Sequence, residues 1–337
     1  MMVSIITPVY NVSGCIRRFI ESMLSQTLTD IEVILVDDHG QDESISIAHQ
    51  ITDSYTGQIT FRYLETPCNS GPGAARNIGL DAAQGKYVAF VDSDDTIDPE
   101  FCHYLVESAE HNDSDMCCCH LEIFDENGSS QGVKCNPPVP DGEFSGQVRR
   151  QFLSSYVSYF TTFIYRREML DRNGIRFPAG RSSEDSMMLC CALLCCRRIS
   201  QVNRYMYRYL RQSGSLTMKT DATRYRQKLD SMNALMKGIR ERGWYSLDKD
   251  ELDFIYYKKG FLVSVFNYIA NTGTPRTDVI KGIYQELKTV LPDYRNCPYV
   301  KGSLKFRMLG LLIGSAPAVS IWVIRLYLKL KGGQTML

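Results

Sequence analysis

The sequence predicts an α/β protein, in which a mostly parallel β-sheet is flanked by helices and followed by a helical C-terminal extension. Over residues 3–91, short apolar runs alternate with segments of helical periodicity. This alternation is typical of parallel strands joined by right-handed helical crossovers. Polar or acidic residues follow directly after several of the apolar runs. After residue 220 the pattern is helical throughout.

The first part of the chain contains four apolar runs that we interpret as strands. The runs end at turn-forming or acidic residues such as Asn11 and Asp37, as buried strands commonly do. Pro72 suits the first turn of a helix, where its missing N–H costs nothing. We expect strands at residues 3–9, 31–36, 59–64 and 87–91, and helices from Ser13 or Gly14 to about Ser25, through Ile45 and Ile47, and over 74–83.

The pattern becomes less regular after Pro99, and residues 127–142 are rich in turn-forming side chains. Helical periodicity then dominates the C-terminal third, which could supply a dimer surface. We expect a helix to Glu110, a strand at 116–124, a helix at 144–153, a strand at 163–165 with a short helix to Arg172, an apolar helix from Glu184 to about Cys196, and helices at 223–240, 252–270 and 278–291.

Length and composition limit the possible classes of protein. The 337 residues suit one large domain with an appendage, and 44% hydrophobic residues are ample for a core. Because 38 basic residues balance 38 acidic ones, the net charge suggests no nucleic-acid partner. The twelve cysteines include neighbouring groups inside apolar runs, which indicates small buried side chains instead of disulfides. A strand begins almost at once, without a secretory leader, so we expect a cytoplasmic protein.

The C-terminal tail differs in character from the rest of the chain. Residues 308–324 carry no charge, whereas Lys301, Lys305 and Arg307 precede them and Arg325 and Lys329 follow. Seventeen residues is near the lower limit for a membrane-spanning helix. Basic flanks and an aromatic residue fit a helix at the membrane surface better. Three structures for this tail remain compatible with the pattern: a helix at the membrane surface, a membrane-spanning helix, and a helix buried on its own domain. We favour the helix at the membrane surface.

Acidic residues cluster where the predicted strand 87–91 ends. Asp92, Asp94 and Asp95 lie within four positions and repel one another, which a bound divalent cation such as Mg²⁺ or Mn²⁺ would relieve. A solvated turn that caps the next helix is the alternative. Tyr10 and Asp37 also follow predicted strands. Because ligands of parallel sheets bind beyond the carboxyl ends of the strands, these positions together predict a binding site.

Five motifs in order resemble the family 2 glycosyltransferases, inverting enzymes with the GT-A fold, here of the bacterial cell-surface polysaccharide type. Two positions depart from the usual sequence of the family. Residues 37–40 read Asp-Asp-His-Gly, where the family usually has Asp-Asp-Gly-Ser, and Ser183 stands where a glycine often precedes the Glu-Asp pair. The matching stretches are VSIITPVYN at 3–11, EVILVDD at 32–38, N-x-G-x-x-x-A-R-N-x-G at 69–79, DSDD at 92–95 and ED at 184–185.

The resemblance implies a nucleotide-sugar donor and a divalent metal, Mn²⁺ or Mg²⁺. Asp94 occupies the family's metal-binding position, and Asp92 the position that contacts the ribose or the metal shell. Asp37 matches the residue that contacts the base edge, which a uracil or a guanine could satisfy; we favour a UDP-sugar.

Further positions complete the implied donor site. Tyr10 can lie against the base, with Thr7 and Pro8 shaping that wall. Arg76 either supports the nucleotide, orients Asp37 and Asp92, or is a plain salt bridge within the acidic cluster.

The Glu184–Asp185 pair is where the resemblance places the chemistry. An inverting transfer needs a general base for the acceptor hydroxyl. In the family the aspartate is that base, so we assign Asp185, with Glu184 as the fallback or as a contact to the acceptor. Acids that simply favour a helix N-terminus are the alternative.

Residues 204–211 alternate basic and aromatic side chains. Arg208 and Arg211, with Ser213 and Ser215, resemble a mobile loop that covers the diphosphate in related enzymes. Equally, the stretch fits a strand with tyrosines packed inward and arginines in solvent. The five histidines show no spacing typical of metal ligands.

The resemblance gives a domain plan and a function. We expect a catalytic domain at 1–220, with a nucleotide-sugar half at 1–95 and an acceptor half at 96–220, then a helical extension at 221–300 and a basic, apolar tail at 301–337. The expected activity is hexosyl or N-acetylhexosaminyl transfer to a glycan or lipid-linked acceptor at the inner face of the cell membrane. The alternatives are a nucleotidyltransferase and a non-catalytic sugar-binding or nucleotide-binding module on the same fold.

Overall fold

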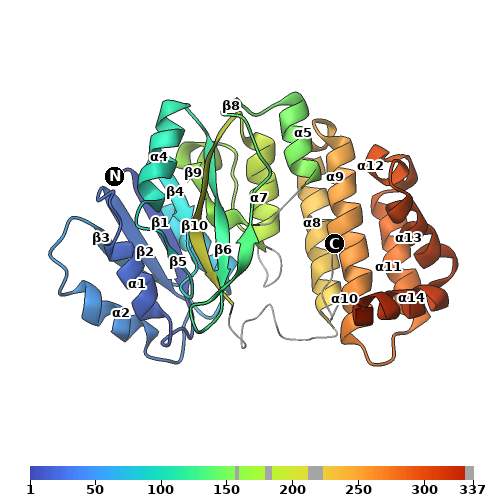
Figure 1. Cartoon of the computed structure of the whole chain (residues 1–337), viewed down its shortest axis with the longest axis horizontal. Helices are drawn as coiled ribbons and strands as arrows, with labels where there is room; N and C mark the ends of the chain where they lie inside the picture. The colour runs from blue at the N-terminus through green and yellow to red at the C-terminus, as the bar shows by residue number, and fades with distance from the viewer. Residues whose placement is uncertain (156–158, 179–183, 212–222, 331–337) are drawn as a thin grey trace. The chain divides into compact units, whose positions relative to one another are not determined.

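The computed structural model describes residues 1–155, 159–178, 184–211 and 223–330 (Figure 1). The chain divides into two compact units. The first comprises Met1–Phe152 and Val157–Ser215, and the second Leu153–Tyr156 and Leu216–Leu337. The first unit is an α/β unit and the second is helical where described, which confirms the predicted fold class. The subdivision of the first unit at residue 95 stays a prediction.

The predicted parallel strands form half of the sheet in the first unit. β1 (Val3–Val9) pairs in parallel with β2 (Ile31–Asp37) on one side and with β4 (Tyr87–Phe90) on the other, and β3 (Thr60–Glu65) extends the sheet beyond β2. All four strands lie within two residues of the positions expected from the sequence.

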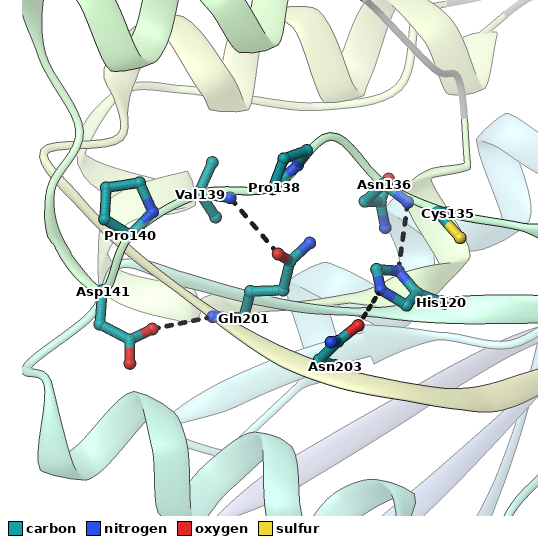
Figure 2. A pocket seen from close by; sticks show the side chains of 9 residues that line it. All are labelled: His120, Cys135, Asn136, Pro138, Val139, Pro140, Asp141, Gln201 and Asn203. Atoms are coloured by element: carbon teal, nitrogen blue, oxygen red, sulfur yellow. Dashed lines mark hydrogen bonds between the residues drawn. The ribbon is translucent and has the colours of Figure 1, made fainter.

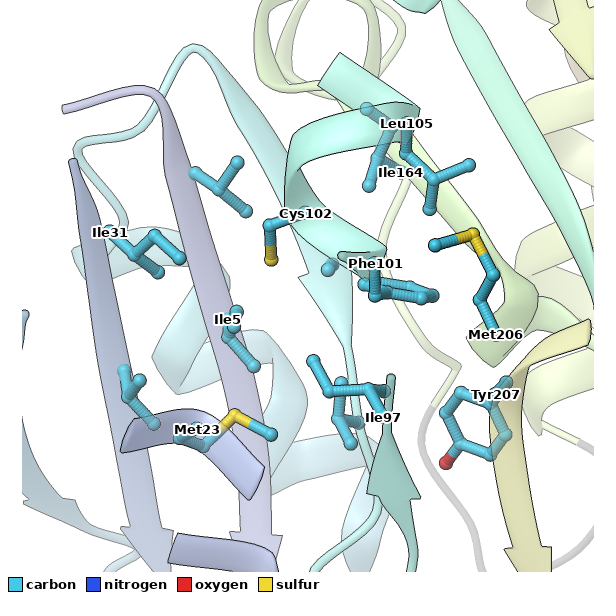
Figure 3. Packing of buried hydrophobic residues seen from close by; sticks show 14 of the residues in the cluster. Ile5, Met23, Ile31, Ile97, Phe101, Cys102, Leu105, Ile164, Met206 and Tyr207 are labelled. Atoms are coloured by element: carbon cyan, nitrogen blue, oxygen red, sulfur yellow. The ribbon is translucent and has the colours of Figure 1, made fainter. Parts of the chain in front are cut away.

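Helices cover both faces of this half-sheet because alternate residues of each strand point to opposite faces. On one face Ile5 of β1 joins a core with Met23 and Phe101 (Figure 3). On the other, Gly79 lies so close to Ile6 that an added Cβ would come within 2.4 Å of the isoleucine side chain. The helices are α1 (Ile16–Leu24), α2 (Ser44–Thr52), α3 (Pro72–Ala82) and α4 (Phe101–His111).

The other half of the sheet mixes strand directions. In the described residues the strand order is β3-β2-β1-β4-β9-β6-β10-β5, with β7 beside β6 and β8 beside β10. β9 runs antiparallel to both β4 and β6, and β10 runs parallel to β6. The bounds are β5 (Thr96–Ile97), β6 (Met116–Phe124), β7 (Ser130–Lys134), β8 (Gly142–Glu143), β9 (Phe163–Arg166) and β10 (Arg198–Leu210).

The structure corrects one expectation here and adds detail to a second region. The stretch 127–142, expected to be turns, contains β7 and β8, and β7 has no buried residue to reveal it. β10 begins at Arg198, six residues before the basic and aromatic stretch that the sequence shows. Up to Leu210 the basic and aromatic stretch is a strand; Ser213 and Ser215 lie outside the described residues.

The remaining helices of this unit are α5 (Gly146–Ser154, which runs into the second unit), η1 (Phe160–Thr162), α6 (Arg167–Arg172) and α7 (Glu184–Cys195).

The second unit is built of helices around buried tyrosines and aliphatic residues. The expected helix over 252–270 is interrupted by a π-helical stretch, η4. The elements are α8 (Arg224–Glu241), η3 (Trp244–Ser246), α9 (Lys249–Ile255), η4 (Tyr256–Leu262), α10 (Val263–Asn271), α11 (Thr277–Val290), η5 (Tyr294–Asn296), α12 (Pro298–Lys301), α13 (Leu304–Ser315) and α14 (Pro317–Leu330).

The uncharged run 308–324 is not one helix. α13 ends at Ser315 and α14 begins at Pro317, because proline cannot continue a helix from its N-terminal side. In the described part of the chain, no helix has the length and apolar character needed to cross a bilayer. All twelve cysteines fall in the described ranges, and none of them forms a disulfide there.

Candidate active site

Three strands of the parallel half-sheet end at the same edge and bring the predicted donor-site residues together. In the β1–β2 register Val9 pairs with Asp37, so Tyr10 and Asp37 lie on neighbouring strand ends. On the other side of β1, the Val91 N–H donates to the carbonyl of Ile6, which directs Asp92 to this edge.

The two aspartates that end β2 have different environments. Asp38 is buried, and its carboxylate accepts hydrogen bonds from the Thr66 hydroxyl and from the N–H groups of Ser70 and Gly71, at 2.7–2.9 Å. It therefore fixes the loop that leads into α3. Asp37 is half-buried and accepts the N–H of Gly40 at 3.3 Å. Sequence reasoning missed the role of Asp38, although the paired acids were visible.

The turn after Asp37 accommodates the departure from the family pattern. His39 has a φ of 58°, in the left-handed region, and its Nε2 contacts the carbonyl of Thr66. The neighbouring Gly40 passes so close to Asn11 that an added Cβ would meet the Asn11 nitrogen at 2.9 Å. Histidine thus replaces the usual glycine at the left-handed position, and Asp37 keeps its place.

The chain changes from buried to exposed where β1 ends. Thr7 and Pro8 are buried in the strand, and within the described residues the Thr7 hydroxyl has no hydrogen-bond partner. Tyr10 is 44% exposed, so its ring is free to stack on a planar ligand. The strand therefore presents Tyr10 to the edge and holds Thr7 and Pro8 beneath it.

Arg76 connects the two halves of the predicted site. It projects from α3, is buried, and donates from Nη2 to a carboxylate oxygen of Asp92 at 2.6 Å. Its Nη1 lies 3.6 Å from a carboxylate oxygen of Glu184. The guanidinium also lies over the rings of Phe160 and Phe177, at 4.7 and 5.3 Å from their centroids. One buried cation therefore bridges the acids after β4 and the acids that begin α7.

These neighbours determine the pKa, and thus the charge, of the Arg76 guanidinium. Burial alone would lower the pKa of its guanidinium, but the charges of Asp92, Glu184 and Asp185 raise it. The arginine is therefore a fixed positive charge. Its Nε and Nη1 are buried and have no hydrogen-bond partner within the described residues, and Nη1 faces the Glu184 carboxylate.

The three aspartates of the acidic cluster after β4 lie in different environments. Asp95 is buried and accepts the Tyr207 hydroxyl at 2.6 Å and the Leu210 N–H at 2.8 Å. Burial and the charges of Asp94 and Asp92 raise the pKa of Asp95 well above its usual value. Asp95 thus joins the turn to β10, whereas Asp92 and Asp94 remain half-buried at the edge.

Asp92 and Asp94 have the character expected of ligands for a divalent cation. Burial, followed by the charge of Asp92, raises the pKa of Asp94 to about 6, so the Asp94 carboxylate is under-compensated by the protein. Within the described residues no three His, Cys, Asp or Glu side chains are arranged around one metal position. The protein offers two carboxylates, and phosphate oxygens and water would complete the coordination, as is common for Mg²⁺.

The first turn of α7 holds the predicted catalytic pair. Glu184 is 8% exposed, and burial raises the pKa of its carboxyl. Its side chain packs against Gly73 of α3, where an added Cβ would lie 3.1 Å away. Asp185 is half-buried, and its Oδ1 accepts the Ser186 N–H at 2.6 Å. The adjoining Ser183 lies outside the described residues.

Arg208 is paired away from the acidic cluster. Its guanidinium lies 3.2 Å from a carboxylate oxygen of Asp98, on the exposed side of β10, whereas Tyr207 points inward to Asp95. Arg211 is exposed at the end of the strand. The contact of these arginines with a diphosphate stays a prediction.

The sheet order, with parallel strands that end in acids at one edge, defines a GT-A-like fold. The family model described as "Glycosyl transferase family 2" matches residues 4–174, and the chain belongs to this family.

Relatives and solved structures agree with this assignment. An uncharacterized glycosyltransferase, EpsJ of Bacillus subtilis, is 32% identical over 64% of this chain and 63% of its own length. The poly(ribitol-phosphate) beta-glucosyltransferase of Bacillus spizizenii is 31% identical over 62% of this chain and 32% of its own length. The chain thus matches less than two thirds of these relatives. The structure of S. aureus TarS 1–349 with UDP-GlcNAc has the same fold, with a TM-score of 0.67, 23% identity, and coverage of 100% of this chain and 93% of that one.

Proposed function

We propose that this protein is an inverting glycosyltransferase that moves a sugar from a nucleotide diphosphate to an acceptor hydroxyl in the synthesis of a cell-surface glycan. The principal support is Arg76, which bridges Asp92 and Glu184. This contact joins a donor-site acid to the neighbour of the predicted base Asp185, which supports a direct transfer between bound donor and acceptor.

The donor is a nucleotide-sugar, and we favour a UDP-sugar with a hexosyl or N-acetylhexosaminyl group. Tyr10 is exposed for stacking on the base, and the Asp37 carboxylate can accept an N–H from the base edge. Two structures with this fold hold such donors: TarS with UDP-GlcNAc, and a mannosyltransferase from Pyrobaculum calidifontis with GDP-Man and Mn²⁺, at 13% identity and a TM-score of 0.53.

Asp94 and Asp92 would hold Mn²⁺ or Mg²⁺ against the diphosphate. When bound, the ion neutralises charge on the departing nucleoside diphosphate. Arg76 orients Asp92 and adds a fixed positive charge at the same edge. These residues together stabilise negative charge that develops as the bond to the sugar breaks.

Asp185 acts as the general base in this proposal. Its carboxylate takes the proton of the acceptor hydroxyl while that oxygen attacks the anomeric carbon from the face opposite the nucleotide. The bond to the nucleotide breaks in the same step, so the configuration inverts. Glu184 is less suited to the role because it is almost fully buried and lies near Arg76.

The test is a panel of nucleotide-sugars with the full chain, in the presence and absence of Mn²⁺. Thermal unfolding and donor hydrolysis are measured for UDP-, GDP- and dTDP-sugars. We expect metal-dependent stabilisation by one nucleotide class, of a few kcal/mol at saturating ligand. If the folded protein responds to no nucleotide with metal present, the transferase proposal is wrong and the non-catalytic module is favoured.

We also propose that the two C-terminal helices bind the cytoplasmic surface of an anionic membrane, where a lipid-linked acceptor would lie. Leu304, Met308 and Leu311 form an exposed stripe on α13, at intervals of three and four residues. α14 carries a second stripe, made of Val319, Trp322, Leu326 and Leu330. Each helix thus leaves one apolar face in solvent, in addition to the face it buries.

Charge complementarity favours a membrane over other occupants of these stripes. Lys305, Arg307 and Lys329 lie on the same helices and are exposed, and the sequence contains no Asp or Glu after Asp293. An apolar stripe with basic neighbours suits anionic lipid headgroups and the acyl boundary beneath them.

Vesicle co-sedimentation tests this surface. The full chain should bind vesicles with 30% phosphatidylglycerol but not pure phosphatidylcholine, and Trp322→Ser with Leu326→Ser should abolish binding. Leu247→Ser is the matched control, because Leu247 is 54% exposed but lies outside both helices. A concentration-dependent dimer that the double variant dissociates, without vesicle binding, would show that a second copy covers the stripes instead.

A further inference from the structure

A pocket of about 500 Å³ lies outside the acidic edge, between the segment 135–141 and the strands β6 and β10. Figure 2 shows the segment passing over the side chains of His120, Gln201 and Asn203. None of the site residues described above lines it. Its size falls within the range of about 300–1,000 Å³ that is usual for small-molecule sites.

The pocket is preformed by hydrogen bonds along the whole segment. The Gln201 side chain donates to the carbonyl of Pro137 at 3.2 Å and accepts the Val139 N–H at 3.3 Å. The Gln201 N–H donates to an Asp141 carboxylate oxygen at 3.2 Å (Figure 2). Three prolines, at positions 137, 138 and 140, restrict the backbone further. A ligand would therefore bind a segment that is already ordered.

One polar atom of the wall has no hydrogen-bond partner. Asn136 is 3% exposed, and its Nδ2 donates to the carbonyl of Cys119 and to the Thr162 hydroxyl, at 2.6 and 2.8 Å. These two acceptors fix the orientation of the amide. Within the described residues its Oδ1 is buried without a donor. Because this oxygen is buried, the amide supports the wall of the pocket through the two hydrogen bonds that its Nδ2 donates.

His120 fixes a second amide. The Asn136 N–H donates to His120 Nδ1 at 3.2 Å, so Nε2 carries the proton and donates to Asn203 Oδ1 at 2.8 Å. The Asn203 NH₂ group is thereby left as the donor that faces solvent. The pocket thus presents an oriented donor, the Asn203 NH₂ group, and one carboxylate, that of Asp141.

The lining favours a neutral polyhydroxylated ligand. Among the described residues that line the pocket, none is lysine or arginine, so a phosphate or nucleotide would find no counter-charge. Amide and carboxylate groups pair well with sugar hydroxyls, which both donate and accept. Pro138 and Pro140 supply apolar surface for the C–H face of a sugar ring.

We propose that this pocket binds a neutral sugar residue of the glycan acceptor, other than the residue that receives the transferred sugar. This inference rests on the proposed transferase function. β10 connects the two places: Asn203 lines the pocket, and Tyr207, four residues further on, bonds to Asp95. Four residues of strand span on the order of 10 Å, so the pocket would extend recognition of the acceptor beyond the transfer centre.

The test uses saturation-transfer NMR on the full chain with glucose, galactose, N-acetylglucosamine and N-acetylgalactosamine as probes. UDP and Mn²⁺ are present at saturating concentration so that the donor site is occupied. We expect at least one probe to bind, and the Asn203→Ala and Asp141→Ala variants to bind it about tenfold more weakly, as expected for loss of a hydrogen bond to a ligand. Both residues are exposed, so the fold should tolerate these changes.

Gln131→Ala is the matched control, because Gln131 is an exposed amide on the neighbouring β7; it should bind the probe like the wild type. The inference is overturned if no probe binds, or if Asn203→Ala and Asp141→Ala bind the probe as well as the control does. Thermal stabilisation by UDP and Mn²⁺ is measured in each variant. If it is absent in the wild type, the proposed transferase function has failed, whereas its presence without sugar binding overturns the pocket alone.

Discussion

Arg76 and Asp92 form an ion pair in which the guanidinium Nη2 donates to the carboxylate at 2.6 Å. The arginine side chain is 6% exposed and the aspartate side chain 31%. The pair therefore has a buried side, which holds it in place, and an open side, which faces the edge where the strands end. A ligand that bound Asp92 would contact a carboxylate whose position is already fixed.

Arg76→Lys should impair both stability and transfer. A lysine ammonium lacks the planar fork that reaches Asp92 and Glu184 together and lies over two rings. We expect a loss of about 1–3 kcal/mol in the free energy of unfolding, measured by urea denaturation, and a lower kcat in a coupled assay for release of the nucleoside diphosphate.

Arg176→Lys is the control for that change. Arg176 also pairs with two carboxylates, those of Asp81 and Asp171, but its side chain is 34% exposed. Exposed pairs contribute about 0–1 kcal/mol. Equal losses in the two variants would mean that the burial of Arg76 has no special effect.

Asp185→Asn should separate donor binding from transfer. An amide keeps the size of the side chain but cannot accept the acceptor's proton, so transfer should fall by about 10²–10⁴-fold while UDP-sugar still stabilises the protein. Glu184→Gln, measured beside it, should lose less transfer. Full transfer by Asp185→Asn would exclude Asp185 as the base.

Asp94→Asn should abolish the metal dependence of donor binding and leave the fold intact. Asp94 is under-compensated within the protein, so a neutral amide does not remove a stabilising partner. Asp95→Asn is the informative comparison, because Asp95 holds Tyr207 and the Leu210 N–H. We expect that variant to lose about 1–3 kcal/mol of stability. The measurement is thermal unfolding with UDP, with and without Mn²⁺; persistent metal dependence in Asp94→Asn would contradict the metal assignment.

The sequence was sufficient for the parallel half-sheet because three of its strands, β1, β2 and β4, are buried apolar runs with clear ends. Val3–Val9 is buried along its whole length, and such a run has few alternative structures. β7 was missed because all five of its residues are exposed, so no alternation of apolar and polar residues marks it. β5 and β8 are two residues long, too short for any period to show.

The candidate site was predictable in its residues but not in its contacts. The sequence could not distinguish Asp94 from Asp95, since the partner that turns Asp95 inward is Tyr207, 112 positions away. In the same way, no local pattern joins Arg76 to Glu184, because the two residues lie far apart in the sequence, on α3 and α7. Asp38 looked like a second donor-site acid and is in fact bonded to the loop before α3.

Glu32 gives a prediction for the pH dependence of stability. It is fully buried on β2 and accepts hydrogen bonds from the Ser4 hydroxyl, Arg62 and the Gln84 N–H, at 2.5–2.7 Å. Burial alone would raise the pKa of the Glu32 carboxyl, but these hydrogen bonds and the charge of Arg62 hold it below its usual value. A lowered pKa in the folded state stabilises the protein above the unfolded pKa of about 4.3. That contribution is lost as the pH falls through the folded pKa.

Glu32→Gln should therefore destabilise the protein by about 1–3 kcal/mol at pH 7, and the difference from the wild type should shrink as the pH falls below about 4. At neutral pH the amide can accept fewer of the three hydrogen bonds and cannot compensate the Arg62 charge. At low pH the wild-type carboxyl is itself neutral, so the two proteins become alike. Urea denaturation at several pH values measures this difference. Glu65→Gln, at an exposed position on the next strand, should change stability by less than about 0.5 kcal/mol at each pH. If Glu32→Gln is equally destabilised at pH 3 and pH 7, the loss comes from packing, and the ionised Glu32 does not stabilise the sheet.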